Sequence, residues 1–261
     1  MSLIERNDDG AICRLLLNQP SRLNVLSEDF LNALQVELDG GRKSKNVRCV
    51  IISGAGNGFC AGHDLKEMTE QRKNSDGGVA YFQDLFVRCS KMMTTIQSLP
   101  QPVIAQVHGI ATAAGCQLVA SCDLAVADKS ARFGVNGVNI GLFCSTPMVA
   151  LTRAIGRKRA FEMLVTGRFI EAKEAKEIGL VNKISEIDQL EKTTDELAMQ
   201  ITNKLGEAVK IGKEAFYKQA EMNLKDAYDY TGTVMAENMM LEQTKKGINF
   251  FLDKKTPEWD Q

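Results

Sequence analysis

The chain has 261 residues, a length that suits one sizeable domain or one domain with a smaller appendage. Its formal net charge of -1 provides no global basic field, which disfavours nucleic acid as the main partner. No apolar run approaches the roughly 18 residues of a membrane span, and the first ten residues do not resemble a targeting signal. The seven cysteines form no CxxC pair and indicate buried thiols in a reducing compartment. We therefore expect a soluble cytoplasmic protein.

Short apolar or β-branched runs alternate with stretches of helical periodicity in the first two-thirds of the chain. The expected strands are residues 11–17, 47–54, 103–107 and 124–128. The expected helices are residues 28–40, 63–68 and 79–99. Such alternation predicts parallel βαβ units, in which each helix returns the chain across a sheet face. The helices expected between 190 and 252 have no strands to cover, so they should pack on one another or on a neighbouring subunit.

Two segments share a pattern in which a strand leads into small residues and then into a helix: "IISGAGNGFCAGHDL" and "VIAQVHGIATAAGCQL". Small side chains let main-chain N–H groups approach a ligand closely, and the first N–H groups of a helix have no partner within it. Two such turns aimed at one point would donate to a carbonyl oxygen that becomes an enolate. Tight packing of helix on sheet explains the same residues without a ligand. Neither segment has a Walker pattern, and Phe59 occupies the third glycine position of the dinucleotide fingerprint beginning at Gly54.

The segments "NGFCAGHDLKEM" and "PVIAQVHGIATAAGCQLVASCDLAVADKSARFGVNGVNIGL" resemble the enoyl-CoA hydratase/isomerase (crotonase) family, and the resemblance runs almost end to end. It implies an α/β fold with a crotonase (ClpP-like) ββα spiral core and a C-terminal helical layer. We assign residues 1–190 to the core, with its oxyanion hole and CoA site, and residues 191–261 to a helical region for oligomerisation and CoA capping. The resemblance also implies a coenzyme A thioester substrate, no prosthetic group, and a homotrimer or dimer of trimers.

The same resemblance assigns candidate roles to individual residues. The main-chain N–H groups of His63 and Ala114 would form the oxyanion hole for the thioester. The residues expected near the bound CoA are Arg22, Ala61, Gly62, Asp64, Leu65, Lys66, Gly115, Phe251 and Lys254. Of these, Phe251 and Lys254 would close over the nucleotide from a C-terminal helix of this chain or of a neighbour.

The chain departs from the family at its acid–base positions. The two glutamates that hydratases use fall on Gln117 and Gly137, neither of which exchanges a proton near neutral pH. A third position, an aspartate in some dienoyl isomerases and in a branched-acyl hydrolase, falls on Ser145. Losing an acid–base group typically removes about 10²–10⁴ in rate, so ordinary hydration is doubtful.

Other side chains around the two turns remain candidates for chemistry. The imidazole of His63 suits proton transfer if it faces the α-carbon, and Glu67 would contribute if it pointed inward. Asp64 is expected to cap the following helix. The residues that would act as nucleophiles only beside a base are Cys116, Cys144 and Ser145. The residues that would orient a water or a carboxylate are Asn136 and Asn139. No cluster of metal ligands accompanies Cys60 and His63, so no metal site is expected.

Three functions remain open on the sequence alone. The first is an enzyme similar to the enoyl-CoA hydratases and isomerases, acting as a lyase or an isomerase, with a relocated or weakened acid–base group. The second is a malonyl-type acyl-CoA decarboxylase, because loss of CO₂ forms the same enolate without a base. The third is a non-catalytic acyl-CoA binding protein that kept the pocket and lost the chemistry.

Overall fold

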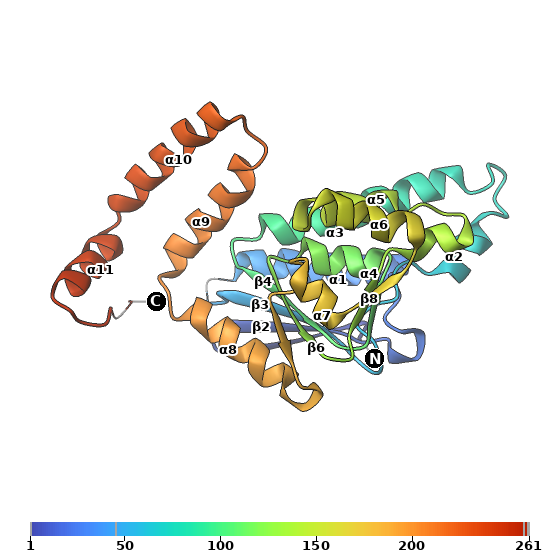
Figure 1. The fold of residues 1–261 in the computed structure, drawn as a ribbon, viewed down its shortest axis with the longest axis horizontal. Helices are drawn as coiled ribbons and strands as arrows, with labels where there is room; N and C mark the ends of the chain where they lie inside the picture. The colour runs from blue at the N-terminus through green and yellow to red at the C-terminus, as the bar shows by residue number, and fades with distance from the viewer. Residues whose placement is uncertain (1, 45, 258, 260–261) are drawn as a thin grey trace.

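The computed structural model describes residues 2–44, 46–257 and 259, and its centre is a six-stranded sheet (Figure 1). In spatial order the strands are β1 (Ile4–Asp9), β2 (Ile12–Leu17), β3 (Cys49–Gly54), β4 (Val103–Val107), β6 (Leu124–Asp128) and β9 (Lys183–Ser185). β1 runs antiparallel to β2, and the other neighbouring pairs are parallel. The expected parallel βαβ arrangement is therefore confirmed. β1 was not expected, because its sequence IERNDD is almost entirely polar, which suits only an edge strand.

A second, smaller sheet guides the chain toward the two small-residue turns. Its strands are β5 (Ile110–Thr112), β7 (Arg132–Gly134) and β8 (Phe169–Glu171). β5 pairs with β7 in parallel, and β7 pairs with β8 in antiparallel fashion. Two residues after β5 the chain enters the helix that carries Ala114, so this sheet fixes where that helix begins.

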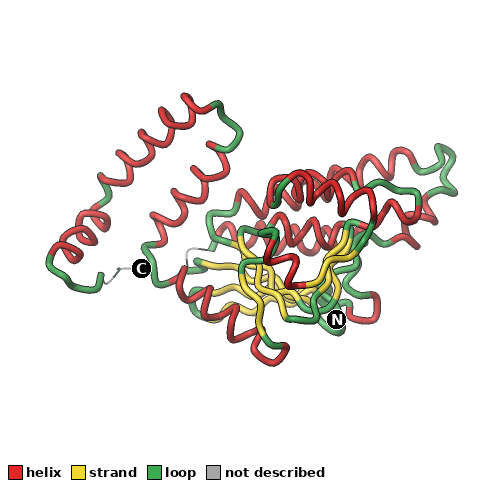
Figure 2. Tube along the Cα trace, in the orientation of Figure 1, coloured by secondary structure: helices red, strands yellow, loops and turns green. Residues whose placement is uncertain are grey.

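Helices gather over one face of the large sheet, as Figure 2 shows. The helices of the core before residue 190 are α1 (Glu28–Lys43), α2 (Leu65–Gln71), α3 (Val79–Ser98), α4 (Ala114–Ser121), α5 (Ser145–Ala154), α6 (Arg157–Thr166) and α7 (Ala172–Glu177). Short 3-10 turns are η1 (Pro20–Arg22), η2 (Asn136–Ile140) and η3 (Ile187–Gln189). α4 is buried on nearly every side, because seven of its eight residues are buried against neighbouring elements. Its position is therefore tightly determined by packing.

α8 (Leu190–Thr202) covers the opposite face of the large sheet. Its buried residues Leu190 and Ala198 join a separate apolar cluster with Cys49, Ile51 and residues of β4 and β6. The intervening residues of the strands face the main core, so the sheet is buried on both faces. The expectation that the late helices have no strands to cover is wrong for α8. The division at residue 190 stays a prediction about folding units, and by its packing we place α8 with the core.

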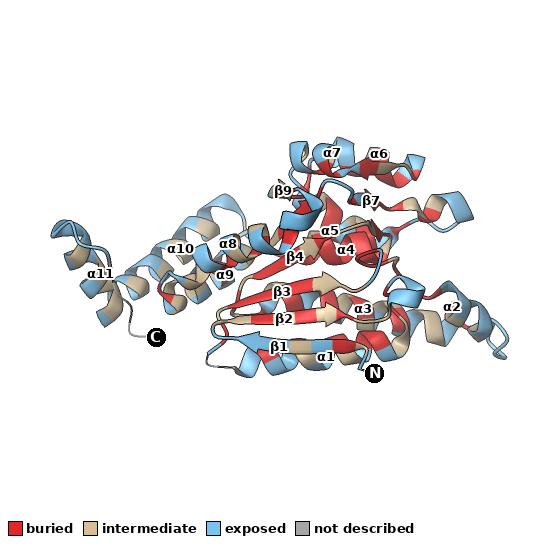
Figure 3. Cartoon of the chain, turned by 90° about the horizontal axis from the view of Figure 1, so that it is seen from below, coloured by how far each residue is buried: buried red, intermediate tan, exposed pale blue. Residues whose placement is uncertain are grey.

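The last three helices form an arm that projects from the core: α9 (Gly206–Gln219), α10 (Leu224–Met239) and α11 (Glu242–Leu252) (Figure 1). α9 packs against α10, as expected of helices that support one another. α10 and α11 contain no buried residue, and Figure 3 shows the contrast between this arm and the buried strands. The apolar side chains exposed along α10 and α11 include Leu224, Tyr228, Met235, Met239 and Phe251.

A buried ion pair fastens the arm to the core. Lys213 on α9 is 8% exposed, and its Nζ donates to the carbonyls of Ile96 and Gln101 and to Asp123 Oδ2, at 2.9, 2.9 and 2.6 Å. Tyr217 donates its hydroxyl to the other carboxylate oxygen of Asp123 at 2.7 Å. Burial lowers the pKa of Lys213, and the nearby Asp123 opposes that shift. All three ammonium protons are used, so α9 is held in one position relative to the end of α4.

Candidate functional site

The two small-residue turns predicted from the sequence lie in direct contact. A Cβ added to Gly62 would lie 3.0 Å from the carbonyl oxygen of Thr112 and 3.1 Å from the main-chain nitrogen of Ala114. A Cβ added to Gly115 would lie 2.1 Å from the carbonyl oxygen of Cys60. Gly62 also has a φ of +86°, which favours glycine. The glycines therefore bring the segment before α2 against the start of α4.

Two main-chain N–H groups at this junction are left without acceptors. Within the described part of the chain, no backbone or side-chain group accepts a hydrogen bond from the N–H of His63 or of Ala114. Ala113, which precedes α4, has φ 50° and ψ -118°, a conformation that costs a non-glycine residue about 1–3 kcal/mol. Its own N–H is held by the carbonyl of Gly134 at 2.8 Å. The sequence did not reveal this strained residue, which orients the first peptide of α4.

Gln117 lies one helical turn beyond Ala114 on α4. Side chains at positions i and i+3 share a helix face, and each leans toward the helix N-terminus. Gln117 is therefore directed toward the Ala114 turn. It is 4% exposed, and its Oε1 is buried without a hydrogen-bond partner among the described residues. A neutral amide thus lies on the same helix face as Ala114, one turn further on, and its oxygen has no partner among the described residues.

Gly137 occupies a turn that has no room for a side chain. A Cβ at this position would lie 2.1 Å from the carbonyl oxygen of Leu142 and 2.9 Å from Cys144 Sγ. The carbonyl of Gly137 accepts the Leu142 N–H at 3.0 Å, and its own N–H donates to Cys144 Sγ at 3.3 Å. The position therefore lacks not only a carboxylate but also the space for one, because the chain folds back over it.

Replacing Gly137 by alanine is expected to lower the free energy of unfolding by about 1–3 kcal/mol, because the new methyl group would overlap main-chain atoms. Urea unfolding of the two proteins measures the difference. The comparison variant is Gly212→Ala on α9, where an added Cβ meets nothing within 4 Å. That variant should gain about 0.5–1 kcal/mol from helix propensity. A Gly137→Ala protein as stable as the parent would contradict the turn described above.

The imidazole of His63 lies in apolar surroundings. Its Nδ1 is 3.4 Å from the carbonyl oxygen of Leu26, and its ring meets that of Phe86 edge-on, with 5.7 Å between centroids. Nε2 is buried without a partner among the described residues. Burial lowers the pKa of His63 below its usual 6.5, so the ring is neutral at physiological pH. The contact with Phe86 could not be found from the sequence, because it depends on how α3 crosses the turn.

The acidic residues after His63 bind the N-terminal ends of helices. Asp64 caps α2 by accepting from the N–H groups of Lys66 and Glu67, at 3.1 and 3.3 Å, and it forms an ion pair with Arg22. The expected capping role of Asp64 is thus confirmed. The Glu67 carboxylate lies 3.3 and 3.4 Å from the main-chain nitrogen of Glu28, at the start of α1. Glu67 therefore helps to satisfy the N-terminus of α1. Burial raises the pKa of its carboxyl group.

The candidate nucleophiles are poorly prepared to react. Burial raises the pKa of Cys116 to about 12 and also raises the pKa of Cys144, so both thiols stay protonated near neutral pH. Ser145 is exposed at the start of α5, where its hydroxyl donates to the carbonyl of Phe143 at 3.4 Å. All seven cysteines are free and buried, as expected from their apolar neighbours.

The two asparagines near Gly137 are both engaged by neighbours. Asn136 accepts the hydroxyl proton of Thr112 at 2.6 Å, and Asn139 donates to the carbonyl of Gly167 at 3.2 Å. Among the described residues, no group of three or more His, Cys, Asp or Glu side chains is arranged to hold a metal ion. None of the described helices has the length and apolar character to span a bilayer.

The residues expected to contact CoA fall into two separate places. Ala61, Gly62 and Gly115 line the junction of the turns, and Arg22, Asp64, Leu65 and Lys66 lie beside it, around η1 and the start of α2. Arg22 and Lys66 also line a groove of about 920 Å³ between η1, α1 and α2. In contrast, Phe251 and Lys254 lie at the far end of the arm, whereas α2 is at the opposite end of the molecule (Figure 1). Within one chain, these two residues cannot close over the others.

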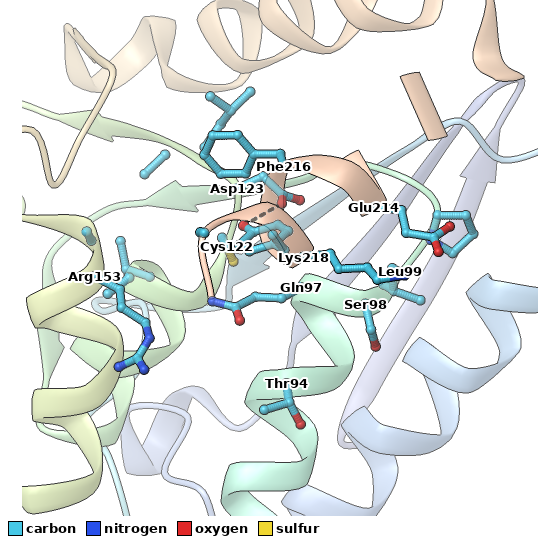
Figure 4. Close-up of a pocket in the computed structure, with 18 of the residues that line it drawn as sticks. Thr94, Gln97, Ser98, Leu99, Cys122, Asp123, Arg153, Glu214, Phe216 and Lys218 are labelled. Carbon is cyan, nitrogen blue, oxygen red and sulfur yellow. Dashed lines mark hydrogen bonds between the residues drawn. The ribbon is translucent and has the colours of Figure 1, made fainter. Parts of the chain in front are cut away.

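A larger groove of about 1230 Å³ lies between α9 and the core (Figure 4). Figure 4 shows Thr94, Gln97 and Ser98 of α3 on one side of it, and Phe216 and Lys218 of α9 on the other. Asp123 also lines this groove, so it meets the end of α4 opposite to Ala114. The groove is therefore separate from the junction of the two turns.

Comparison with known proteins identifies the class of protein that this fold and junction define. The sequence matches the Enoyl-CoA hydratase/isomerase family over residues 7–261. The chain therefore belongs to the enoyl-CoA hydratase/isomerase family, whose members act on CoA thioesters, and it has the crotonase fold.

Individual relatives cover nearly the whole chain. An enoyl-CoA hydratase from Mycobacterium smegmatis has a crystal structure with a TM-score of 0.95 and 48% identity, covering 99% of each chain. Human enoyl-CoA hydratase domain-containing protein 3 gives a TM-score of 0.92 and 42% identity over 98% of this chain and 100% of that structure. The Xenopus laevis protein of the same name is 45% identical over 96% of this chain and 84% of its own length.

The expected cytoplasmic location is wrong by this comparison. The similar proteins from Xenopus laevis, Mus musculus, Homo sapiens and Danio rerio are all named mitochondrial proteins. Buried free thiols indicate only that a compartment is reducing, and they do not distinguish one such compartment from another.

Proposed function

We propose that this protein binds an acyl-CoA thioester and stabilises its enolate with the main-chain N–H groups of His63 and Ala114. The observation that carries the proposal is a pair of N–H groups, on two turns in direct contact, that have no acceptor among the described residues. Donors held rigidly in a dry site stabilise a developing oxyanion strongly, and one such donor is typically worth about 10²–10³ in rate. The strain at Ala113 is consistent with a main chain fixed for this task.

The proposed CoA contacts follow from the same arrangement. Arg22, Lys66 and Leu65 stand beside the junction, where a cation and an exposed apolar side chain suit phosphate and adenine. Because Phe251 and Lys254 lie far from these residues in one chain, we propose that they reach CoA on a neighbouring subunit. A homotrimer or a dimer of trimers would supply that neighbour.

For the reaction, we propose a lyase or isomerase of the family with weak hydration of simple enoyl chains. Of the residues that were candidates for proton transfer, Gln117 is a neutral amide, Gly137 has no side chain and Glu67 lies at α1. Ser145 is exposed and bonded to its own loop. An ionised acid–base pair is thus missing from the positions that hydratases use.

Decarboxylation of a malonyl-type thioester is the second candidate, and the neutral surroundings of Gln117 favour it. In that reaction the bond from the α-carbon to the carboxylate breaks, its electron pair forms the thioester enolate, CO₂ leaves, and water returns a proton to the α-carbon. No protein base is needed, and no carboxylate at Gln117 or Gly137 repels the carboxylate of the substrate. The main-chain N–H groups of His63 and Ala114 would stabilise the enolate oxygen, as they would in the first candidate reaction.

A panel of CoA thioesters incubated with the protein in heavy water tests both candidates by mass spectrometry. The panel contains crotonyl-, butyryl-, malonyl- and methylmalonyl-CoA. Water addition or double-bond migration supports the lyase or isomerase, whereas loss of CO₂ supports the decarboxylase. Slow uptake of deuterium at the α-carbon alone shows a working oxyanion hole without an acid–base group. Binding without any chemistry identifies a non-catalytic acyl-CoA binding protein, and the absence of binding refutes the proposal.

A further inference from the structure

Asn24, in the segment between η1 and α1, is a fully buried amide that binds the loop after β3. Its Nδ2 donates to the carbonyls of Ala55, Gly58 and Phe59, at 3.0, 2.9 and 3.1 Å. Its Oδ1 accepts the N–H of Gln19 at 2.8 Å. A primary amide has two N–H groups, so one of them is shared between two carbonyls. The side chain therefore holds three carbonyl oxygens of one loop around a single nitrogen atom.

The residues on either side of Asn24 hold the peptide group that carries the His63 N–H. The carbonyl of Leu23 accepts the N–H of Ala61 at 2.9 Å, and the N–H of Leu26 donates to the carbonyl of Gly62 at 2.8 Å. The carbonyl of Gly62 and the N–H of His63 belong to the same trans peptide plane, in which they point in opposite directions. The hydrogen bond from Leu26 therefore sets the direction of the His63 N–H.

The backbone of this segment is strained. Leu23 and Asn24 have φ angles of 52° and 53°, in the left-handed region that side chains other than those of asparagine and aspartate rarely occupy. Such a conformation typically costs about 1–3 kcal/mol and persists only where the surrounding contacts determine it. The hydrogen bonds of the Asn24 side chain supply these contacts.

We propose that Asn24 is a positioning residue of the oxyanion hole, which fixes the direction of the His63 N–H by joining residues 23–26 to the loop after β3. This inference rests on the proposed function, because it assumes that this N–H donates to a thioester oxygen. Asn24 is 0% exposed, so it acts through the main chain and does not touch the substrate. The other donor, on Ala114, is held separately, since the preceding N–H of Ala113 donates to the carbonyl of Gly134.

The carbonyl ¹³C resonance of bound butyryl-CoA, labelled at the thioester carbon, tests the position of the donors without requiring a reaction. Hydrogen bonds to the thioester oxygen polarise the carbonyl group and move this resonance downfield. Each protein is studied at a saturating concentration, so a change in affinity does not enter. Asn24→Gly should keep about half of the shift seen in the parent, because one of the two donors is misdirected. Glycine accepts a positive φ, so the change removes the hydrogen bonds without adding strain.

Gln101→Ala is the matched control. Gln101 is a second buried amide, and its Nε2 donates to the carbonyls of Gly41 and Val47, at 3.1 and 3.2 Å. It precedes β4, at the amino-terminal end of the parallel strands, whereas the turns of the oxyanion hole come after the carboxyl ends of β3 and β4. In urea unfolding both variants should be less stable than the parent, but Gln101→Ala should keep the full carbonyl shift.

A third variant, Asn24→Asp, covers the case in which the glycine variant does not fold. It keeps the oxygen that accepts from Gln19, and its buried carboxyl group, when protonated, has one O–H donor for the three carbonyls. Its shift should therefore lie between those of the parent and Asn24→Gly. A parent-sized shift in either Asn24 variant, or an equal loss in Gln101→Ala, would overturn the inference. Butyryl-CoA that binds the parent without any carbonyl shift would instead refute the oxyanion hole of the proposed function, and the inference with it.

Discussion

Replacing Gln117 by glutamate is expected to raise the rate of crotonyl-CoA hydration by at least about tenfold. The change is nearly isosteric, and it puts a carboxylate on the face of α4 beside the free N–H of Ala114. A positioned acid–base group contributes about 10²–10⁴ in rate, and one group restored out of two recovers only part of this. Burial of the new carboxyl should raise its pKa above the usual value near 4.3, so the rate should climb with pH through that raised pKa. Loss of enoyl absorbance measures the rate.

A second amide-to-carboxylate substitution separates this effect from a general gain in negative charge. Gln35 donates to Thr95 between α1 and α3, at 3.1 Å, and Gln35→Glu should leave hydration unchanged. If Gln117→Glu binds crotonyl-CoA as tightly as the parent does but hydrates it no faster, Gln117 does not face the reacting carbons. Restoring a glutamate at Gly137 in the same way is not feasible, because its side chain would collide with the carbonyl oxygen of Leu142.

Replacing Lys213 by methionine is expected to lower the free energy of unfolding by about 3–5 kcal/mol. Methionine keeps the apolar stem but removes three donors, which leaves Asp123 as a partly buried carboxylate without its cation. The carbonyls of Ile96 and Gln101 lose hydrogen bonds in the same step. Urea unfolding followed by circular dichroism measures the loss, and amide exchange should show the arm opening before the core.

Two variants on α9 provide the comparison for Lys213→Met. Lys210 is exposed on the same helix, so Lys210→Met should change stability by less than about 0.5 kcal/mol. Tyr217→Phe removes one hydrogen bond to Asp123 and should cost more than the control but less than Lys213→Met. Equal stabilities of Lys213→Met and Lys210→Met would show that the ion pair does not anchor the arm.

The small-residue turns could be predicted from the sequence because their chemistry is local. Glycines and alanines between a strand and a helix indicate close approach of main chains wherever they occur, and the structure places Gly62 and Gly115 in such contacts. The position of Asp64 as a cap was also readable, since capping involves only the next three residues.

Features that depend on distant segments could not be predicted in this way. The closure over Gly137 depends on the path of the loop back to Leu142, and the sequence reveals only that a carboxylate is missing. Glu67 was a candidate for the site, but its place at the N-terminus of α1 follows from how two helices cross. β1 was missed because an edge strand carries too few apolar residues to show a period. The unpaired nitrogen of His63 depends on contacts with Leu26 and Phe86 together.

Because Lys213 of the arm supplies the cation for Asp123, the core around α4 depends on the arm for its charge balance. Asp123 follows α4 at its C-terminal end, and α4 is only eight residues long, or about 12 Å at 1.5 Å per residue. A chain cut before α9 would therefore leave the Asp123 carboxylate without its cation, one short helix away from the proposed oxyanion hole. The arm is in this sense part of the scaffold that keeps the first peptide of α4 in place.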